Sequence, residues 1–306
     1  MAGRQRLSDP LARFIGGPGD VQTATELDVL RTTVAAFREA GESLALVPTM
    51  GALHEGHLTL VRGARVRADR VAVSIFVNPT QFGPNEDLDA YPRQMEEDAR
   101  LLEAEGVDLL WAPGVAQMYP EGFATTISVA GVSEGFCGAS RPGHFDGVAT
   151  VVCKLFNQVR PDVALFGEKD WQQLAVIRRM ARDLDLTAPQ ADAIVGVPTV
   201  READGLAMSS RNRYLSPEQR KAAAALPRAM REATERIEAG GDVGATLQAL
   251  EQALAEAGFS SVDYADIADA ASLARLDRLG EAPARLLVAA RIGSTRLIDN
   301  MAIDKA

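Results

Sequence analysis

Two of the chain's three histidines lie three residues apart in the segment PTMGALHEGH (48–57). His54 and His57 flank Gly56, and Gly51 precedes them. Three interpretations are open: a metal site, a phosphate-binding turn, or turn histidines that only satisfy nearby hydrogen bonds. A zinc site of the HExxH type needs histidines four residues apart on one helix face, which this spacing does not provide. The segment follows an apolar run and precedes a helical pattern, and because a helix N-terminus favours phosphate, we favour a nucleotide site.

Two further clusters are suited to phosphate. Lys169 and Asp170 come directly after the apolar run DVALF (162–166), and Gln173 follows. Ligands of open α/β sheets bind at the carboxyl ends of the strands, where a lysine supplies a compact cation and a glutamine a neutral amide. The segment MSSRN (208–212) offers two hydroxyls and a guanidinium. The alternative for each cluster is an ordinary solvated helix start or polar loop.

Amide side chains follow another strand-like run. Asn78 and Gln81 come after VAVSIFV, where short amides either orient a small polar substrate or simply cap the turn. The segment CGASRPGHFDGV adds Arg141 and the third histidine, His144. Each cluster is ambiguous by itself, but their recurrence at the expected edge of one sheet favours a shared site.

These clusters need a scaffold, which alternating apolar runs and helical patterns provide. Strand-like runs occupy 43–47, 71–77, 107–113, 162–166 and 193–200, and helical patterns occupy 58–68, 91–106, 147–159 and 171–184. Such alternation is typical of βαβ units with parallel strands. We therefore predict an α/β fold with a doubly wound parallel sheet.

The composition changes near residue 199. A polar, turn-rich segment (201–215) is expected to form a hairpin, and SPEQ (216–219) is a capping box with proline at the first helical position. It opens an alanine-rich helix to about Gly240. A second helix and two strand-like runs, VDYADIA and ARLLVAARIG, follow. The predicted organisation is a flexible extension at 1–20, a nucleotide- and substrate-binding domain at 21–199 and a smaller α+β domain at 200–306.

Composition limits the classes of function. The net charge is −10, and the chain has no basic run, so a nucleic-acid partner is not expected. Cys137 and Cys153 have no metal-ligand spacing, which fits a reduced, cytoplasmic protein. No run approaches 18 apolar residues and the first twenty contain no unbroken apolar stretch, so we expect neither a membrane span nor a secretory signal.

Five segments together resemble the pantothenate synthetase (pantoate–β-alanine ligase) family, in order and in spacing. They are PTMGALHEGH, FVNPTQFGPNEDLDAYPR, RPGHFDGVATVV, FGEKDWQQL and DGLAMSSRNRYLS, and the similarity extends from about residue 21 to 303. The resemblance implies a Rossmann-like nucleotidyltransferase fold with a C-terminal lid and a homodimer. It also implies that pantoate attacks the α-phosphorus of ATP, accompanied by Mg²⁺, and that β-alanine then displaces AMP from pantoyl adenylate.

The resemblance also assigns residues. The ATP site would comprise Met50, Gly51, Ala52, Leu53, His54, Glu55, Gly56, His57, Gly167, Glu168, Lys169, Asp170, Val200, Met208, Ser209, Ser210 and Arg211. The catalytic groups that offset phosphate charge would be His54, His57, Lys169 and Arg211. Gln81 and Gln173 would hold pantoate, with Asn78 nearby, and no protein ligand is assigned to the metal. One departure is Trp171, where the family pattern leads us to expect tyrosine.

Three rival functions share part of this pattern. A nucleotidyltransferase that makes a stable product would share the histidine turn but would not require β-alanine. A protein like the aminoacyl-tRNA synthetases would need an RNA-binding surface, which the acidic balance argues against. A non-catalytic nucleotide-binding relative is the third, and the presence of His54, His57, Lys169 and Arg211 argues against it.

Overall fold

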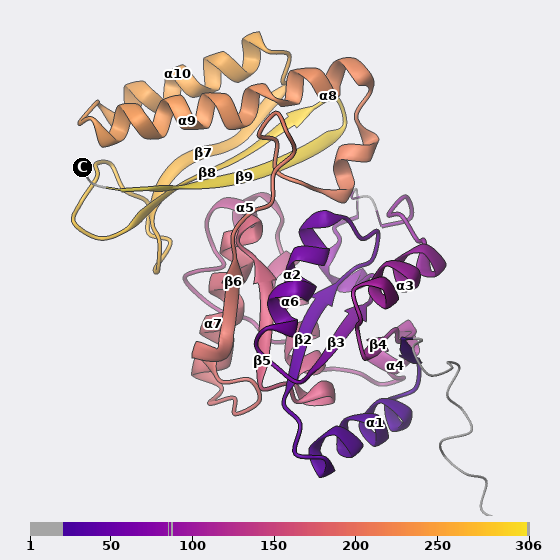
Figure 1. The fold of residues 1–306 in the computed structure, drawn as a ribbon. Helices are drawn as coiled ribbons and strands as arrows, with labels where there is room; N and C mark the ends of the chain where they lie inside the picture. The colour runs from indigo at the N-terminus through magenta and orange to yellow at the C-terminus, as the bar shows by residue number, and fades with distance from the viewer. Residues whose placement is uncertain (1–20, 85, 87, 305–306) are drawn as a thin grey trace, which may run out of the picture.

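The computed structural model describes residues 21–84, 86 and 88–304 (Figure 1). Two sheets organise this part of the chain: a six-stranded parallel sheet and, near the C-terminus, a three-stranded antiparallel sheet. The predicted doubly wound sheet with a smaller α+β C-terminal unit is thereby confirmed. The predicted extension at 1–20 lies outside the described residues.

The parallel sheet has the strand order β1-β4-β3-β2-β5-β6. Its strands are β1 (Gln22–Ala24), β2 (Leu44–Thr49), β3 (Arg70–Ile75), β4 (Leu109–Trp111), β5 (Val163–Gly167) and β6 (Ile194–Val197). From β2 the chain moves outward through β3 to β4, and then crosses back to β5 and β6 on the other side. The neighbours β2 and β5 therefore flank a topological switch point, where α/β sheets bind their ligands.

Helices cover both faces of this sheet (Figure 1). They are α1 (Leu27–Glu39), α2 (Glu55–Arg65), α3 (Met95–Ala104), α4 (Val115–Met118), α5 (Phe136–Ser140), α6 (His144–Val159) and α7 (Trp171–Asp183), with short 3-10 turns η2 (Pro79–Gln81), η3 (Glu168–Asp170) and η4 (Ala191–Ala193). Successive residues of β2 point to opposite faces of the sheet. Leu46 packs in the apolar layer that contains Phe156 of α6, and Val47 packs in the layer that contains Val61 of α2. Burial on both faces explains the continuous apolar strands.

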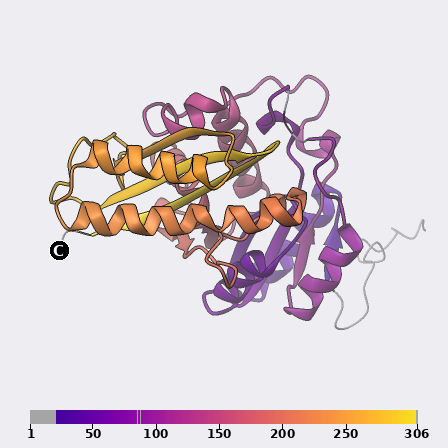
Figure 2. The same cartoon turned by 90° about the horizontal axis from the view of Figure 1, so that it is seen from above.

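The C-terminal part places helices on one face of the antiparallel sheet. It contains η5 (Ser210–Tyr214), α8 (Pro217–Ala223), α9 (Ala225–Glu238), α10 (Val243–Glu256), β7 (Ser261–Asp269), β8 (Ala284–Ile292) and β9 (Thr295–Ile303). Seen from above, α9 and α10 run side by side across the three strands (Figure 2). The predicted capping box is present, because Ser216 and Gln219 each accept the other's backbone N–H.

Several elements differ from the sequence-based expectation. The alanine-rich helix is interrupted at Ala224, because Pro227 lacks an N–H and its ring crowds the carbonyl four residues earlier. Strands β1 and β9 and helix α1 were not predicted. The boundary near residue 199 stays a prediction. No helix among the described residues is long and apolar enough to cross a bilayer.

Candidate active site

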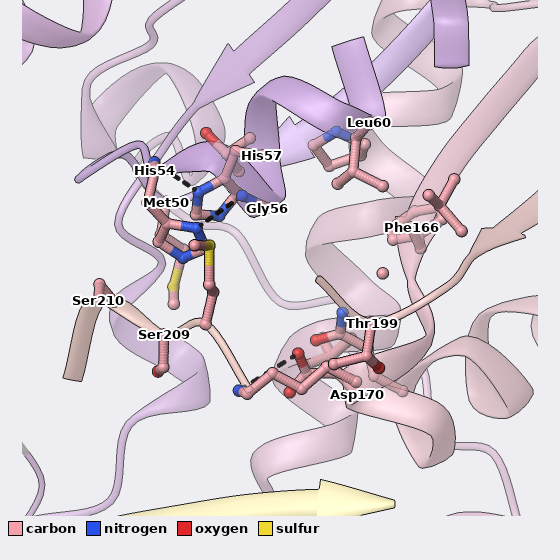
Figure 3. A pocket seen from close by; sticks show the side chains of 18 of the residues that line it. Met50, His54, Gly56, His57, Leu60, Phe166, Asp170, Thr199, Ser209 and Ser210 are labelled. Carbon is pink, nitrogen blue, oxygen red and sulfur yellow. Dashed lines mark hydrogen bonds and ion pairs between the residues drawn. The ribbon is translucent and has the colours of Figure 1, made fainter. Parts of the chain in front are cut away.

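A cavity of about 230 Å³ opens at the switch point, where β2 and β5 end (Figure 3). Leu60, Val152 and Phe166 supply part of an apolar wall. The predicted site residues that the structure brings together around it are Met50, His54, Gly56, His57, Asn78, Gln81, Gly167, Lys169, Asp170, Gln173, Val200, Met208, Ser209, Ser210 and Arg211. Segments that are far apart in the sequence therefore meet at one edge of the sheet.

The two histidines have a defined hydrogen-bonding arrangement at the start of α2. His54 is the N-cap residue, and its Nδ1 accepts the backbone N–H of Gly56 at 3.1 Å. His57 Nδ1 accepts the backbone N–H of His54 at 3.3 Å. Because both Nδ1 atoms act as acceptors, each neutral imidazole carries its proton on Nε2. The rings lie 4.1 Å apart and present a pair of N–H donors beside a helix N-terminus (Figure 3).

Burial keeps both imidazoles neutral. It lowers the pKa of His54 to about 4, and the positive charge of Lys169 contributes in the same direction. Burial likewise lowers the pKa of His57 to about 3, with smaller contributions from His54 and Lys169. Near neutral pH these side chains are therefore hydrogen-bond donors without a net charge. The interpretation of the histidine pair as a zinc site gains no support, since no group of three or more metal-ligating side chains occurs among the described residues.

The turn before His54 is held by a carboxylate that the sequence analysis missed. Asp98 of α3 is only 1% exposed, and its two oxygens accept the backbone N–H groups of Ala52 at 2.9 Å and Leu53 at 2.8 Å. Ala52 adopts a left-handed conformation with φ of 52°, which these bonds stabilise. A signal was present, because Asp98 shares a helix face with the buried Leu102 four residues later.

The opposite wall carries positive charge. Lys169 lies in η3 directly after β5, and its side chain is 19% exposed. Its ammonium group is 4.0 Å from the carboxylate of Asp170, at the outer limit of an ion pair. In Figure 3, Asp170 lies across the cavity from the histidines. Lys169 can therefore turn toward an anion bound between these walls.

A serine loop, residues 208–211, closes a third side. It follows the turn in which Arg201 pairs with Ala207, so the predicted hairpin is present as a single bridge. The backbone N–H of Met208 donates to Val200 at 3.0 Å. The Ser209 hydroxyl accepts the backbone N–H of Arg211 and so caps η5. Two hydroxyls and one guanidinium are thus held at the cavity, as the motif predicts.

The amide side chains lie at the end of β3. The Asn78 amide donates to the side-chain oxygen of Gln81 at 3.0 Å and to the Gly147 carbonyl at 3.1 Å. Its own oxygen accepts the Tyr119 hydroxyl at 2.7 Å. Asn78 is 1% exposed and its amide group is fully engaged, so its contacts orient Gln81. Gln81 and Gln173 line the cavity with neutral amides, which can hydrogen-bond hydroxyl, carbonyl or carboxylate groups.

A second layer of contacts fixes the backbone of Gln81. His144 Nδ1 lies 2.8 Å from the Gln81 carbonyl, so it carries the proton, and Nε2 then accepts from Arg141 at 3.0 Å. Arg141 also makes a bidentate ion pair with Glu86. Burial lowers the pKa of His144 to about 4, which keeps this tautomer neutral. Arg141 and His144, which the sequence analysis singles out, do not line the cavity but hold the Gln81 backbone in place.

Five of the predicted residues do not line the cavity: Gly51, Ala52, Leu53, Glu55 and Glu168. The first three shape the turn, through positive φ at Gly51 and Ala52 and through the bonds to Asp98. Glu55 pairs with Arg62, and Glu168 pairs with Arg285. Their side chains therefore have structural partners, and any contact with ATP would come from their backbone.

Comparison with known proteins decides the family. Residues 22–302 match the family model described as pantoate-beta-alanine ligase, which covers most of the chain. The chain belongs to this family. The pantothenate synthetase of Novosphingobium aromaticivorans is 68% identical over 92% of the chain and 99% of its own length. That of Rhizorhabdus wittichii is 62% identical over 94% of the chain and 100% of its length.

Solved structures agree with this assignment. The crystal structure of pantothenate synthetase from Thermus thermophilus superimposes with a TM-score of 0.84 at 50% identity, covering 91% of this chain and 98% of that one. The pantoate-beta-alanine ligase of Francisella tularensis, complexed with beta-gamma ATP and beta-alanine, gives a TM-score of 0.77 at 32% identity. It covers 91% of this chain and 96% of that chain. The likeness extends over both sheets, so the fold of the whole described chain is that of the family.

Proposed function

We propose that the protein joins pantoate to β-alanine in two steps through pantoyl adenylate. The overall reaction follows from the family: the protein is a ligase that condenses pantoate and β-alanine at the expense of ATP, and the product is pantothenate. In the first step a pantoate carboxylate oxygen attacks the α-phosphorus of ATP, and the bond to pyrophosphate breaks. In the second step the β-alanine amine attacks the acyl carbon, loses a proton and displaces AMP.

One observation carries the nucleotide half of this proposal: two neutral imidazoles hold Nε2–H donors beside the N-terminus of α2. Their Nδ1 atoms are fixed as acceptors by backbone N–H groups, so the donors are oriented before ATP binds. Donors placed in advance against developing negative charge are an effective source of rate enhancement. Lys169 and Arg211 would add full positive charges on the other walls.

Pantoate would occupy the end of the cavity near Gln81 and Gln173. Asn78 and His144 hold Gln81 from its side chain and its backbone, so the amide that meets substrate has little freedom. Fixing the carboxylate near the α-phosphorus converts an encounter of two reactants into a reaction within one complex. No protein nucleophile is needed, because the substrate supplies it.

Mg²⁺ would accompany ATP, and the residues present fit a metal held mainly by the nucleotide. Asp170 is the one carboxylate among the described residues that line the cavity, and 45% of its side chain is exposed. Mg²⁺ commonly binds through one or two carboxylates plus phosphates and keeps several waters. Asp170 would hold it directly or through water. When bound, the ion would neutralise phosphate charge.

We also propose a homodimer that acts in the cytoplasm, with the C-terminal part as a lid that keeps water from the adenylate. The dimer and the lid rest on the family resemblance. The proposed cytoplasmic location is supported by Cys137 and Cys153, neither of which forms a disulfide. Sedimentation of the purified protein tests the dimer: a monomer at the concentrations used for assays would contradict it.

Isotope exchange tests the two-step reaction. Labelled pyrophosphate is incubated with ATP, Mg²⁺ and enzyme without β-alanine, and incorporation of the label into ATP is measured with and without pantoate. Exchange that requires pantoate is expected, because adenylate formation is reversible. If product forms with all substrates but no exchange occurs without β-alanine, the proposal that pantoyl adenylate forms before β-alanine reacts is contradicted.

A further inference from the structure

The antiparallel sheet contacts the backbone beside the active site through the amide group of one side chain. Asn300 lies on β9, is 4% exposed, and donates from its side-chain nitrogen to two backbone carbonyls, those of Glu168 and Lys169, both at 2.8 Å. These carbonyls belong to η3, which has no side-chain cap of its own. The backbone that presents Lys169 to the cavity is therefore held by a residue more than a hundred positions away.

The contacts around Asn300 extend this attachment. The guanidinium of Arg285 on β8 donates to the Asn300 side-chain oxygen, lies 3.3 Å from a carboxylate oxygen of Glu168 and stacks 3.5 Å over the ring of Trp171. The Trp171 indole N–H donates to the Ala270 carbonyl at 2.9 Å. Trp171, the departure from the family pattern, thus binds the C-terminal part. We call Glu168, Trp171, Arg285 and Asn300 the clasp.

Within the clasp, the side-chain oxygen, the side-chain nitrogen and the backbone N–H of Asn300 all have hydrogen-bond partners. Its nitrogen serves the two η3 carbonyls, its oxygen receives Arg285, and its backbone N–H donates to the neighbouring Asp299 carboxylate. A buried amide whose hydrogen bonds are all made holds its neighbours firmly, and loss of the Asn300 amide leaves the partly buried carbonyls of Glu168 and Lys169 without this partner. Removing the Asn300 side chain therefore frees η3 without touching the cavity itself.

We propose that Asn300 is a positioning residue for Lys169, so that seating of the antiparallel sheet on η3 sets the cation against the phosphates of ATP. This rests on the proposed role of Lys169. It makes adenylate formation depend on a residue outside the cavity, and it explains why the sheet contacts η3 through a buried polar side chain instead of an apolar one.

A double-mutant cycle tests the proposal by kinetics. Asn300→Ala is expected to lower kcat/KM for ATP in pantoate-dependent exchange by about tenfold or more, since misplacement by about 1 Å can have effects of up to about a hundredfold. Lys169→Ala is expected to lower it further. The double variant should match Lys169→Ala alone, because Asn300 acts through Lys169. Asn157→Ala is the control, since the Asn157 amide donates only within α6 and should leave kcat/KM unchanged.

Amine labelling tests the same point without relying on activity. Trinitrobenzenesulfonate labelling is followed at each lysine by mass spectrometry, with Lys154 and Lys221 as internal references. In Asn300→Ala, Lys169 should react several-fold faster than in the wild type, and ATP should protect it less. If Asn300→Ala does not fold, Asn300→Asp keeps the shape and replaces the donor by an acceptor. Labelling of Lys169 at the wild-type rate, or kinetic effects that multiply in the double variant, would overturn the proposal.

Discussion

Asp98→Asn removes one of the two oxygens that hold the turn before His54. Both carboxylate oxygens accept backbone N–H groups at 2.8–2.9 Å, and the residue is 1% exposed, so water cannot replace a lost bond. A hydrogen bond to a charged group contributes about 1.5–3 kcal/mol, and an unpaired buried N–H costs about 1–3 kcal/mol. The two contributions describe partly the same loss and do not simply add. We therefore expect the free energy of unfolding to fall by about 2–4 kcal/mol.

The same substitution should affect catalysis, because Ala52 and Leu53 lead directly to the N-cap His54. Relaxation of Ala52 from its left-handed conformation would shift the histidine donors, and a shift of about 1 Å can lower the rate about a hundredfold. We therefore expect a loss of this order in pantoate-dependent pyrophosphate exchange at saturating ATP.

Urea unfolding and the exchange assay measure these two effects. Glu97→Gln is the matched control. Glu97 is an exposed acid in the same first turn of α3, and this substitution removes the same charge near the helix N-terminus as Asp98→Asn does. It should change stability by no more than about 0.5 kcal/mol. If Asp98→Asn behaves like Glu97→Gln in both assays, the turn is not held as described.

Two further predictions concern protonation and substrate placement. Unfolded histidines take up protons near pH 6.5, whereas His54 and His57 in the folded protein have pKa values of about 4 and 3, so stability should fall as the pH drops from about 6.5 toward 4. A His54→Gln/His57→Gln variant should show a shallower slope in urea unfolding over that range, and an unchanged slope would contradict neutral histidines. In Gly147→Ala, the added methyl group would lie 2.5 Å from the Thr80 carbonyl, displacing η2 and Gln81. The KM for pantoate should rise about tenfold, which corresponds to about 1.4 kcal/mol, while the KM for ATP stays near its wild-type value; the opposite pattern would refute the placement of pantoate.

Much of this fold could be predicted because the apolar pattern of the sequence agrees with the burial of the strands in the structure. β2, β3 and β5 are apolar on both faces, as buried parallel strands are, and the histidine turn falls directly after one of them. β9 was missed because Asp299 and Asn300 are buried polar residues in its middle, so it lacks the alternation of a strand. β1 is three residues long and offers almost no pattern.

The parts of the site that could not be predicted depend on distant partners. Asp98 contacts the turn 46 residues earlier in the chain, and Asn300 contacts η3 across 132 residues. The i, i+4 spacing of Asp98 and Leu102 can indicate that Asp98 is buried, but no sequence spacing identifies the distant backbone groups that Asp98 and Asn300 contact. Lys169 and Gln81 were accessible to prediction because each follows a strand at the expected edge of the sheet.

Oxygen transfer tests the central claim most directly. Pantoate labelled with ¹⁸O in its carboxylate is converted with ATP, Mg²⁺ and β-alanine, and the AMP, pyrophosphate and pantothenate are analysed by mass spectrometry. Attack by the carboxylate on the α-phosphorus predicts one ¹⁸O in AMP, none in pyrophosphate and one retained in the new amide carbonyl. AMP without label, or label in pyrophosphate, would contradict a pantoyl adenylate formed in this cavity.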